Sequence, residues 1–216
     1  MKNIYNYQLI SILLLAFFIG SCEDDLNIEP NDSISEIDFL NNPDNAVALV
    51  NGVYNAQLDY SMYSFSWIGM TNITSDDADK GSTPGDTGAD KQKMDNLTFG
   101  PSDISFSDVW NSRYIGIGRT NNALFFLEQL AIDQALKNRL IGEVKFLRAL
   151  FYFDLVRCYG GVPLVTERID INNNQLINDV VYTRRSKEET YAVIEADLLE
   201  AIDLLPLKSQ YAAATD

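Results

Sequence analysis

The sequence has no histidine, only two cysteines, and 16 basic residues against 31 acidic ones among its 216 residues. The lack of histidine removes the most common general base and metal ligand near neutral pH, which excludes Ser-His-Asp, Cys-His and histidine–metal sites. The net charge of −15 excludes nucleic acid as a partner, because phosphates are bound by basic surfaces. If Cys22 is modified, Cys158 has no cysteine to pair with, and a disulfide framework is excluded as well.

Charge is almost absent from the first 21 residues, where Lys2 is the only charged side chain. The apolar run from Leu9 to Ile19 is shorter than the ~20 residues that a helix needs to span a bilayer. Its length and basic start are typical of a signal peptide. It ends in Ile19-Gly20-Ser21-Cys22, which resembles a lipobox. We therefore expect residues 1–21 to be a lipoprotein signal peptide and the Cys22 thiol to take the lipid; an ordinary secretory signal is the alternative.

An acidic cluster, Glu23-Asp24-Asp25, follows directly. It resembles the export signal that sends some lipoproteins to the outer face of the outer membrane, and a solvated tether is the alternative. We expect residues 22–42 to be an acidic tether and lead-in. Because the rest of the chain is strongly acidic, we expect the lipid anchor, rather than attraction to anionic headgroups, to hold the protein at the membrane.

Apolar residues recur at spacings of three and four in four segments, and this periodicity predicts four helices. We expect them at residues 43–59, 107–130, 133–159 and 186–205. No strand pairs compete with them, so the predicted class is mainly α. Paired amphipathic helices of this length suggest antiparallel hairpins stacked as a short α-solenoid, joined by long irregular loops.

Local signals support the helix ends, and the periodicity assigns the buried faces. Ser186 and Glu189 form a capping-box pattern before the last helix, and Gly160-Gly161 is a stop signal after the third. Asn121 is a polar side chain on an apolar stripe, so we expect it to hydrogen-bond a neighbouring backbone. The residues expected on the buried faces of the first and last helices are Val47, Val50, Tyr54, Leu58, Tyr191, Ile194, Leu198, Ile202 and Leu205.

Residues 60–105 break the helical pattern, and Gly81 to Gly88 are turn-forming residues. We expect one long loop here, with a short strand or turn at residues 97–99. A loop of this length is usually functional or disordered, and its aromatic flanks favour function. An aromatic face beside amides and carboxylates suits sugar binding. The candidate ligand residues are Tyr63, Trp67, Asn72, Asp76 and Asp77, with Tyr60, Phe65 and Asp79 beside them. The alternative is that the aromatic rings belong to the core.

The same acidic residues are candidates for calcium, a cation that prefers carboxylate oxygens. Asp76, Asp77 and Asp79 fail the EF-hand pattern, because Gly81 is misplaced and no glutamate closes the loop. We therefore expect no metal or cofactor, with calcium as the alternative. No pair of carboxylates is singled out for glycoside hydrolysis either, so we expect a binding protein rather than an enzyme.

The strongest motif runs from Glu143 to Val165. It reads Glu143-Val144-Lys145-Phe146-Leu147-Arg148-Ala149-Leu150-Phe151-Tyr152-Phe153-Asp154-Leu155, followed by Tyr159-Gly160-Gly161 and Pro163-Leu164. This pattern resembles the signature of the SusD/RagB family of outer-membrane nutrient-binding lipoproteins. Three further stretches, at residues 51–54, 110–122 and 185–206, agree with the family in order, so the resemblance covers essentially the whole chain after the signal peptide.

The resemblance implies a tetratricopeptide-like scaffold whose irregular loops form the ligand face. It also implies a surface lipoprotein of the outer membrane that caps a SusC-like TonB-dependent transporter and delivers oligosaccharides, or sometimes peptides, to it. Family members are much longer, so we expect residues 43–216 to be their N-terminal helical domain, incomplete at its C-terminal end. A surface-anchored glycoside hydrolase and a structural lipoprotein scaffold are the alternatives.

The side chains of the signature helix are expected to pack rather than to bind a ligand. Arg148 and Glu143 are expected to make polar contacts between helices, and Cys158 to be a small buried hydrophobic residue. Tyr152 and Phe153 are expected to pack against neighbouring helices. The expected core residues are Phe146, Leu147, Leu150, Phe151 and Leu155.

Overall fold

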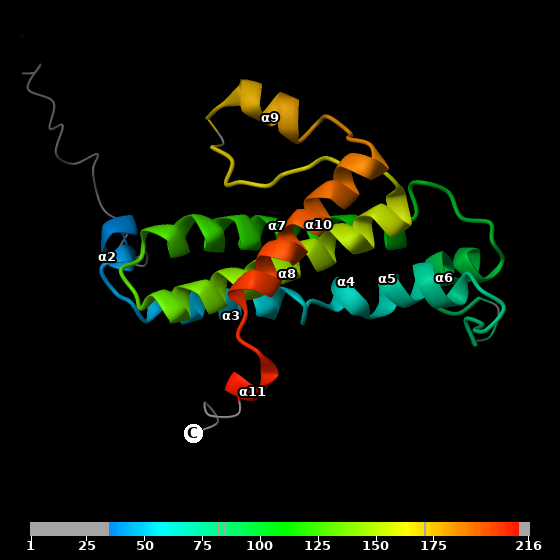
Figure 1. Ribbon diagram of the computed structural model, residues 1–216. Coiled ribbons are helices and arrows are strands. Elements are labelled where there is room, and N and C mark those ends of the chain that lie inside the picture. Colours follow the sequence, from blue (N-terminus) through cyan, green and yellow to red (C-terminus); the bar gives the residue numbers. More distant parts are fainter. Residues whose placement is uncertain (1–34, 82, 84, 171, 212–216) are drawn as a thin grey trace, which may run out of the picture. The chain divides into compact units, whose positions relative to one another are not determined.

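The computed structural model describes residues 35–81, 83, 85–170 and 172–211 (Figure 1). The chain divides into two units, residues 1–38 and 39–216, and the second unit is described below. Cys22, the predicted signal peptide and most of the predicted tether lie outside the described residues. None of the helices in the described part is both long and apolar enough to cross a bilayer.

Four helices form the frame of the second unit. They are α3 (Asn45–Ala56), α7 (Ile104–Gln129), α8 (Gln134–Tyr159) and α10 (Lys187–Leu204). A short turn joins α7 to α8, and the two lie side by side as an antiparallel hairpin (Figure 1). Helix α3 packs against both, and α10 packs across α8. The described residues contain no strand, so the predicted mainly α class, built from helical hairpins, is confirmed.

Capping groups and glycines end these helices, and the predicted Ser186–Glu189 and Gly160–Gly161 signals are among them. The Asp133 carboxylate accepts a hydrogen bond from the Leu136 amide and caps α8, and Ser186 and Glu189 form the predicted capping box at the start of α10. Gly160 follows α8 with a φ of 76°, a conformation that favours glycine. At Gly161 a Cβ atom would lie 1.9 Å from the Arg185 carbonyl oxygen, so only glycine fits where the chain before α10 passes α8.

The core lies between α3, α7 and α8, but only Val50 of the predicted buried face of the first helix is buried. Leu58 is 80% exposed, and Val47 and Tyr54 are also exposed. Helix α3 contacts two helices at once, and small side chains let the backbones approach each other closely. Val50 is buried as predicted, and the other buried side chains on α3 are Ala46, Val53 and Ala56.

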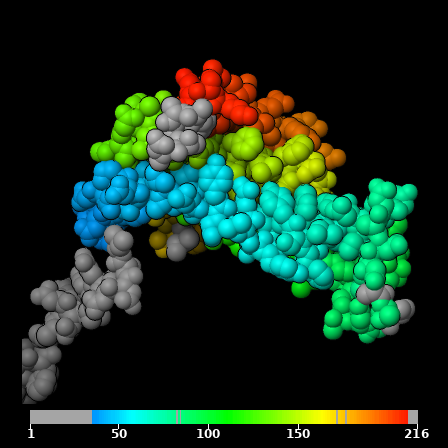
Figure 2. Space-filling model, turned by 90° about the horizontal axis from the view of Figure 1, so that it is seen from below, coloured from blue at the N-terminus to red at the C-terminus, as the bar shows by residue number. Residues whose placement is uncertain are grey.

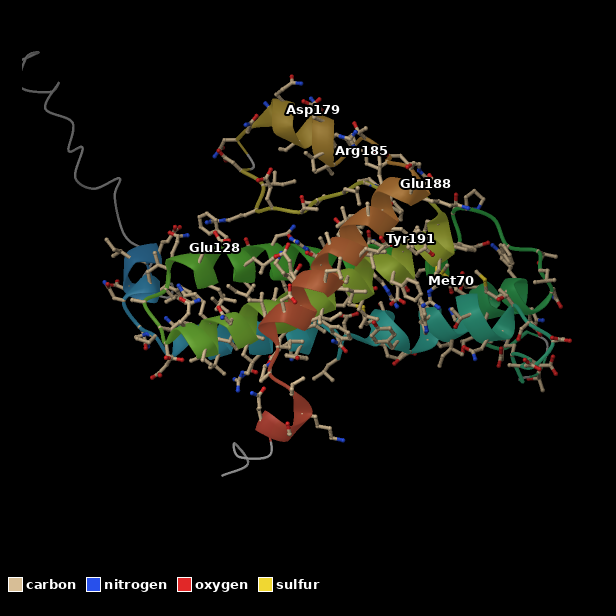
Figure 3. All side chains as sticks on the ribbon, in the orientation of Figure 1. Met70, Glu128, Asp179, Arg185, Glu188 and Tyr191 are labelled. Atoms are coloured by element: carbon tan, nitrogen blue, oxygen red, sulfur yellow. The ribbon has the colours of Figure 1, made fainter. Side chains whose placement is uncertain are left out.

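The predicted faces of α10 and α8 also need correction. Ile202 is 72% exposed, and Tyr191 is exposed as well (Figure 3), although Ile194 is buried as predicted. Helix α10 buries the polar residues Thr190 and Asp197 instead, which find partners inside the protein. On α8, Phe146 and Phe153 are exposed, while the core predictions for Leu147, Phe151 and Leu155 and the packing of Tyr152 are confirmed. Cys158 is half-buried rather than fully buried.

The segment predicted as one long loop contains short helices. These are α4 (Tyr60–Tyr63), α5 (Phe65–Ile68), the π-helix η2 (Gly69–Ile73) and α6 (Ala89–Asp95), and the described residues between η2 and α6 form no helix or strand. No strand forms at residues 97–99, where Leu97 has a φ of 54°. Figure 2 shows α3, α4 and α5, coloured blue to cyan, following one another along one face. Three further short helices are α2 (Glu36–Leu40), α9 (Asn174–Val180) and α11 (Lys208–Tyr211).

A buried lysine fixes α6 to the rest of this region. The Lys91 ammonium lies 2.7 Å from the Asp90 carboxylate and 2.6 Å from the Ser105 hydroxyl, and it sits over the Phe65 ring. A Cβ atom at Gly69 would lie 2.9 Å from the Lys91 side chain. Periodicity predicts the burial of apolar residues and cannot predict this arrangement. A lysine is rarely buried without such partners, and periodicity does not show which residues they are.

Candidate functional site

An extended segment after α8, residues 162–168, is held by side chains rather than by a neighbouring strand. We call this segment the strap. The Tyr114 hydroxyl on α7 donates to the Pro163 carbonyl at 2.8 Å. The Tyr152 hydroxyl on α8 accepts from the Val165 amide at 2.7 Å and donates to the Val165 carbonyl at 2.9 Å. Burial raises the pKa of both hydroxyls, so they remain protonated donors at neutral pH.

Two buried polar residues complete the attachment of the strap. The Asn121 amide nitrogen donates to the carbonyls of Val165 and Glu167 at 2.8 and 3.2 Å, which confirms the backbone hydrogen bond predicted for it. Arg148 donates to the Thr166 carbonyl at 2.6 Å and to the Asn121 carbonyl oxygen at 2.9 Å. Arg148 also binds Asp197 of α10 through two nitrogens, each 2.7 Å from a carboxylate oxygen. The inter-helix role predicted for Arg148 is therefore confirmed.

Glu143, the other polar residue of the signature, has one partner on its own helix and one on α3. Its carboxylate lies 3.4 Å from Arg139, one turn away on α8. Burial raises the pKa of Glu143, while Arg139 and a hydrogen bond with Tyr54 on α3 oppose that rise. The bond with Tyr54 is the polar contact between helices that the sequence predicts for this residue.

The strap and α7 enclose an open groove with a volume of about 810 Å³. This volume falls in the range of ~300–1,000 Å³ that is usual for pockets that bind small molecules. The lining residues are Gly118, Asn121, Asn122, Phe125, Val165, Glu167, Arg168, Ile169, Asp170 and Asn172.

The groove combines an aromatic ring with amides and charged groups. The Phe125 ring is 38% exposed, and the Arg168 guanidinium stands over it at 4.7 Å from the ring centroid. One Asp170 carboxylate oxygen accepts from the Asn172 backbone amide at 2.9 Å and from its side-chain amide at 3.1 Å. Rings, amides and carboxylates together can bind a ligand that carries both hydroxyls and an apolar face.

Sequence reasoning missed this groove, although Asn121 was a signal for it. An amide on an apolar stripe indicates a backbone partner, and that partner is the strap. The residues of the other wall, from Val165 to Asn172, lie more than 40 positions after Asn121, and periodicity does not show that they face α7.

The predicted ligand residues Tyr63 and Trp67 lie together, in an edge-on contact with 5.8 Å between ring centroids. The guanidinium of Arg113 lies 4.3 Å from the Trp67 centroid and 4.9 Å from the Tyr63 centroid. Arg113 is fully buried and pairs with Asp154 at 3.2 Å. Burial, and then the Asp154 carboxylate, raise the pKa of Tyr63. The two half-buried rings therefore help to enclose a buried cation, and a ligand role for them stays a prediction.

Asn72, Asp76 and Asp77 follow on η2 and the turn after it, and all three are exposed. The Asn72 side-chain oxygen accepts a hydrogen bond from the neighbouring Thr71 hydroxyl at 2.8 Å. Within the described part of the chain, no group of three or more acidic, histidine or cysteine residues is placed to hold a metal ion. A ligand role for these residues stays a prediction, as does the expected absence of a metal, with calcium as the alternative.

Comparison with known proteins identifies relatives of this chain. A family model described as "Starch-binding associating with outer membrane" matches residues 31–215. A SusD-like protein of Formosa agariphila is 28% identical over 203 residues, which are 93% of this chain and 38% of the relative. A SusD-like protein of Bacteroides ovatus is 24% identical over 222 residues, which cover 100% of this chain and 38% of that relative.

Solved structures show the same helical arrangement. A laminarin-binding SusD-like protein has 32% sequence identity and a TM-score of 0.64, with 76% of this chain and 35% of the other covered. A SusD-like protein of Bacteroides fragilis has 26% identity and a TM-score of 0.60, with 83% of this chain and 32% of the other covered. The chain thus spans about a third of the length of these relatives, and its helical fold is theirs.

Proposed function

Because the chain belongs to the SusD-like family, we propose that it is part of a surface lipoprotein that binds nutrient glycans and passes them to an outer-membrane transporter. The observation that carries this proposal is the match of the family model to residues 31–215. The laminarin-binding relative, at 32% identity, supports a saccharide as the ligand. The partner would be a SusC-like TonB-dependent transporter, and a peptide is the alternative ligand.

Non-catalytic binding is part of the proposal. The sequence has no histidine, so any hydrolysis would fall to a pair of carboxylates held at a fixed separation across the sugar. The carboxylates of the groove do not suggest such a pair, because Asp170 is engaged by its neighbour Asn172. An aromatic ring beside amides is instead an arrangement for holding a saccharide unchanged.

The test is calorimetric titration of the complete natural protein with defined oligosaccharides, followed by chromatography of the mixture after long incubation. We expect saturable binding and recovery of the intact oligosaccharide. Appearance of shorter sugars would support a glycoside hydrolase instead. Absence of binding across neutral and acidic glycans would overturn the proposal and leave a peptide-binding protein or a structural scaffold as the function.

Transfer to a transporter needs a separate experiment. An affinity-tagged form of the protein, solubilised from its own outer membrane in mild detergent, should retain a TonB-dependent transporter through purification. Recovery of the tagged protein without any transporter, under conditions that preserve glycan binding, would contradict the transport part of the proposal.

A further inference from the structure

The groove between α7 and the strap is separate from the patch around Tyr63 and Trp67 that the sequence predicts as the ligand site. We propose that this groove is a binding site for a neutral saccharide, with Phe125 as the stacking surface and Asn122 as a hydroxyl-binding amide. The inference rests on the proposed function and adds to it a location and a ligand class.

The aromatic surface is held in place before any ligand arrives. The Phe125 ring contacts Phe126 edge-on, with 5.2 Å between the centroids. The Arg168 guanidinium covers both rings, at 4.7 and 5.1 Å from their centroids. A ring that already has a fixed orientation loses little conformational entropy when a sugar stacks on its remaining exposed surface.

The wall of the groove is equally well ordered. The strap carries Val165 and Glu167 into the groove, and Asn121 binds the carbonyls of both residues. Arg148 secures Asn121 in turn, at 2.9 Å, and is itself bound by Asp197 on α10. Three helices therefore fix the spacing between Phe125 and the strap, as a binding site for a rigid sugar ring requires.

Charge selects the class of saccharide. The groove contains two carboxylates, Glu167 and Asp170, and one cation, Arg168, whose guanidinium is stacked on phenylalanine rings. The chain as a whole carries a net charge of −15. A uronic-acid or sulfated glycan would be repelled by this surface. A neutral glycan would not be repelled, because its hydroxyls can donate hydrogen bonds to the carboxylates and accept them from the amides.

The test compares two groove variants with two matched controls in the complete natural protein. Asn122→Ala removes the amide, and Asn111→Ala, an exposed asparagine on the same face of α7 three turns away, is its control. Phe125→Ala removes the ring, and Phe146→Ala, an exposed phenylalanine on α8, is its control. Each protein is titrated with laminarin oligosaccharides, which are neutral, and with alginate oligosaccharides, which are uronic acids. Circular dichroism checks that each variant is folded.

We expect the unchanged protein to bind the laminarin oligosaccharides and not the alginate ones. Both groove variants should lose affinity by about tenfold, and both controls should bind as the unchanged protein does. If the unchanged protein binds a neutral glycan and folded Asn122→Ala and Phe125→Ala bind it equally well, the groove is not the site, and the proposed function stands. Tighter binding of alginate would overturn the assigned ligand class. Failure of the unchanged protein to bind any glycan would overturn the proposed function itself.

Discussion

At the scale of single residues, the buried polar side chains define this protein more than the apolar ones do. Arg113, Arg148, Asp154 and Asp197 are all within 5% of complete burial, and each has an oppositely charged partner. A buried charge without a partner costs several kcal/mol, whereas a paired one fixes the relative positions of the elements that carry it. Arg148 in this way joins α8, α10 and the strap through one guanidinium.

Replacement of Tyr152 by phenylalanine tests how the strap is held. The change removes a hydroxyl that both accepts from and donates to Val165, and it leaves two partly buried backbone groups without that partner. We expect the free energy of unfolding to fall by about 1–3 kcal/mol. The Val165 amide should exchange with deuterium faster than in the unchanged protein. Tyr191→Phe, at an exposed position on α10, is the control, and equal effects of the two variants would contradict the role of Tyr152.

Asp90 gives a prediction about pH. Burial raises its pKa, but hydrogen bonds from Lys91 and Ser105 outweigh burial and hold the pKa below the ordinary value of 3.8. A carboxyl group with a lowered pKa in the folded state stabilises the protein above its ordinary pKa, and this contribution disappears as the pH falls through the lowered pKa.

We therefore expect Asp90→Asn to be less stable than the unchanged protein at neutral pH, with a difference that shrinks below about pH 4. Urea unfolding at a series of pH values measures it, and Asp95→Asn in the same helix controls for the loss of one charge. If the difference in unfolding free energy between the unchanged protein and Asp90→Asn stays constant as the pH falls, the proposed role of Asp90 is wrong.

At the scale of helices, glycines set how closely α7 and α8 approach each other. A Cβ atom at Gly116 of α7 would lie 2.7 Å from the Phe151 ring on α8. Gly118, half a turn further along α7, has no atom within 4 Å of such a Cβ. Gly116 and Gly118 therefore have different roles in α7, because packing against α8 requires a glycine only at position 116.

The pair Gly116→Ala and Gly118→Ala tests this difference. Gly116→Ala should destabilise the protein by about 1–3 kcal/mol, because the new methyl group overlaps a ring that is fully buried. Gly118→Ala should stabilise it by up to about 1 kcal/mol, because alanine favours the helix more than glycine does. Denaturant unfolding of both variants provides the comparison. A stabilising effect of Gly116→Ala would show that α7 and α8 lie further apart than described.

The sequence predicts the helices well because their signals are local. The Ser186 capping box and Gly160 act within a few residues of each helix end. The buried faces are less predictable, because they depend on distant partners. Asp197 is buried only because Arg148, 49 positions earlier, pairs with it, and the apolar Ile202 is left exposed. The groove is missed for the same reason, since its two walls come from distant parts of the chain.

At the scale of the whole molecule, we propose a protein with a membrane anchor, a helical scaffold and a ligand site. The proposed anchor is Cys22, at the end of a stretch that resembles a lipobox. Cys22→Ala should leave the precursor without lipid, so the protein should leave the outer-membrane fraction. Membrane fractionation after a high-salt wash measures this, with Cys158→Ala as the control for loss of a thiol. Unchanged outer-membrane recovery of Cys22→Ala would show that another feature anchors the protein.

The central claim is that this part of the protein binds the glycan, in a groove whose wall is held by the signature helix. Hydrogen–deuterium exchange of the complete natural protein, with and without a saturating neutral oligosaccharide, tests it most directly. We predict that the ligand slows exchange in peptides covering residues 118–126 and 162–170. A saturated protein whose exchange changes only outside residues 35–211, or only around Tyr63 and Trp67, would contradict the claim.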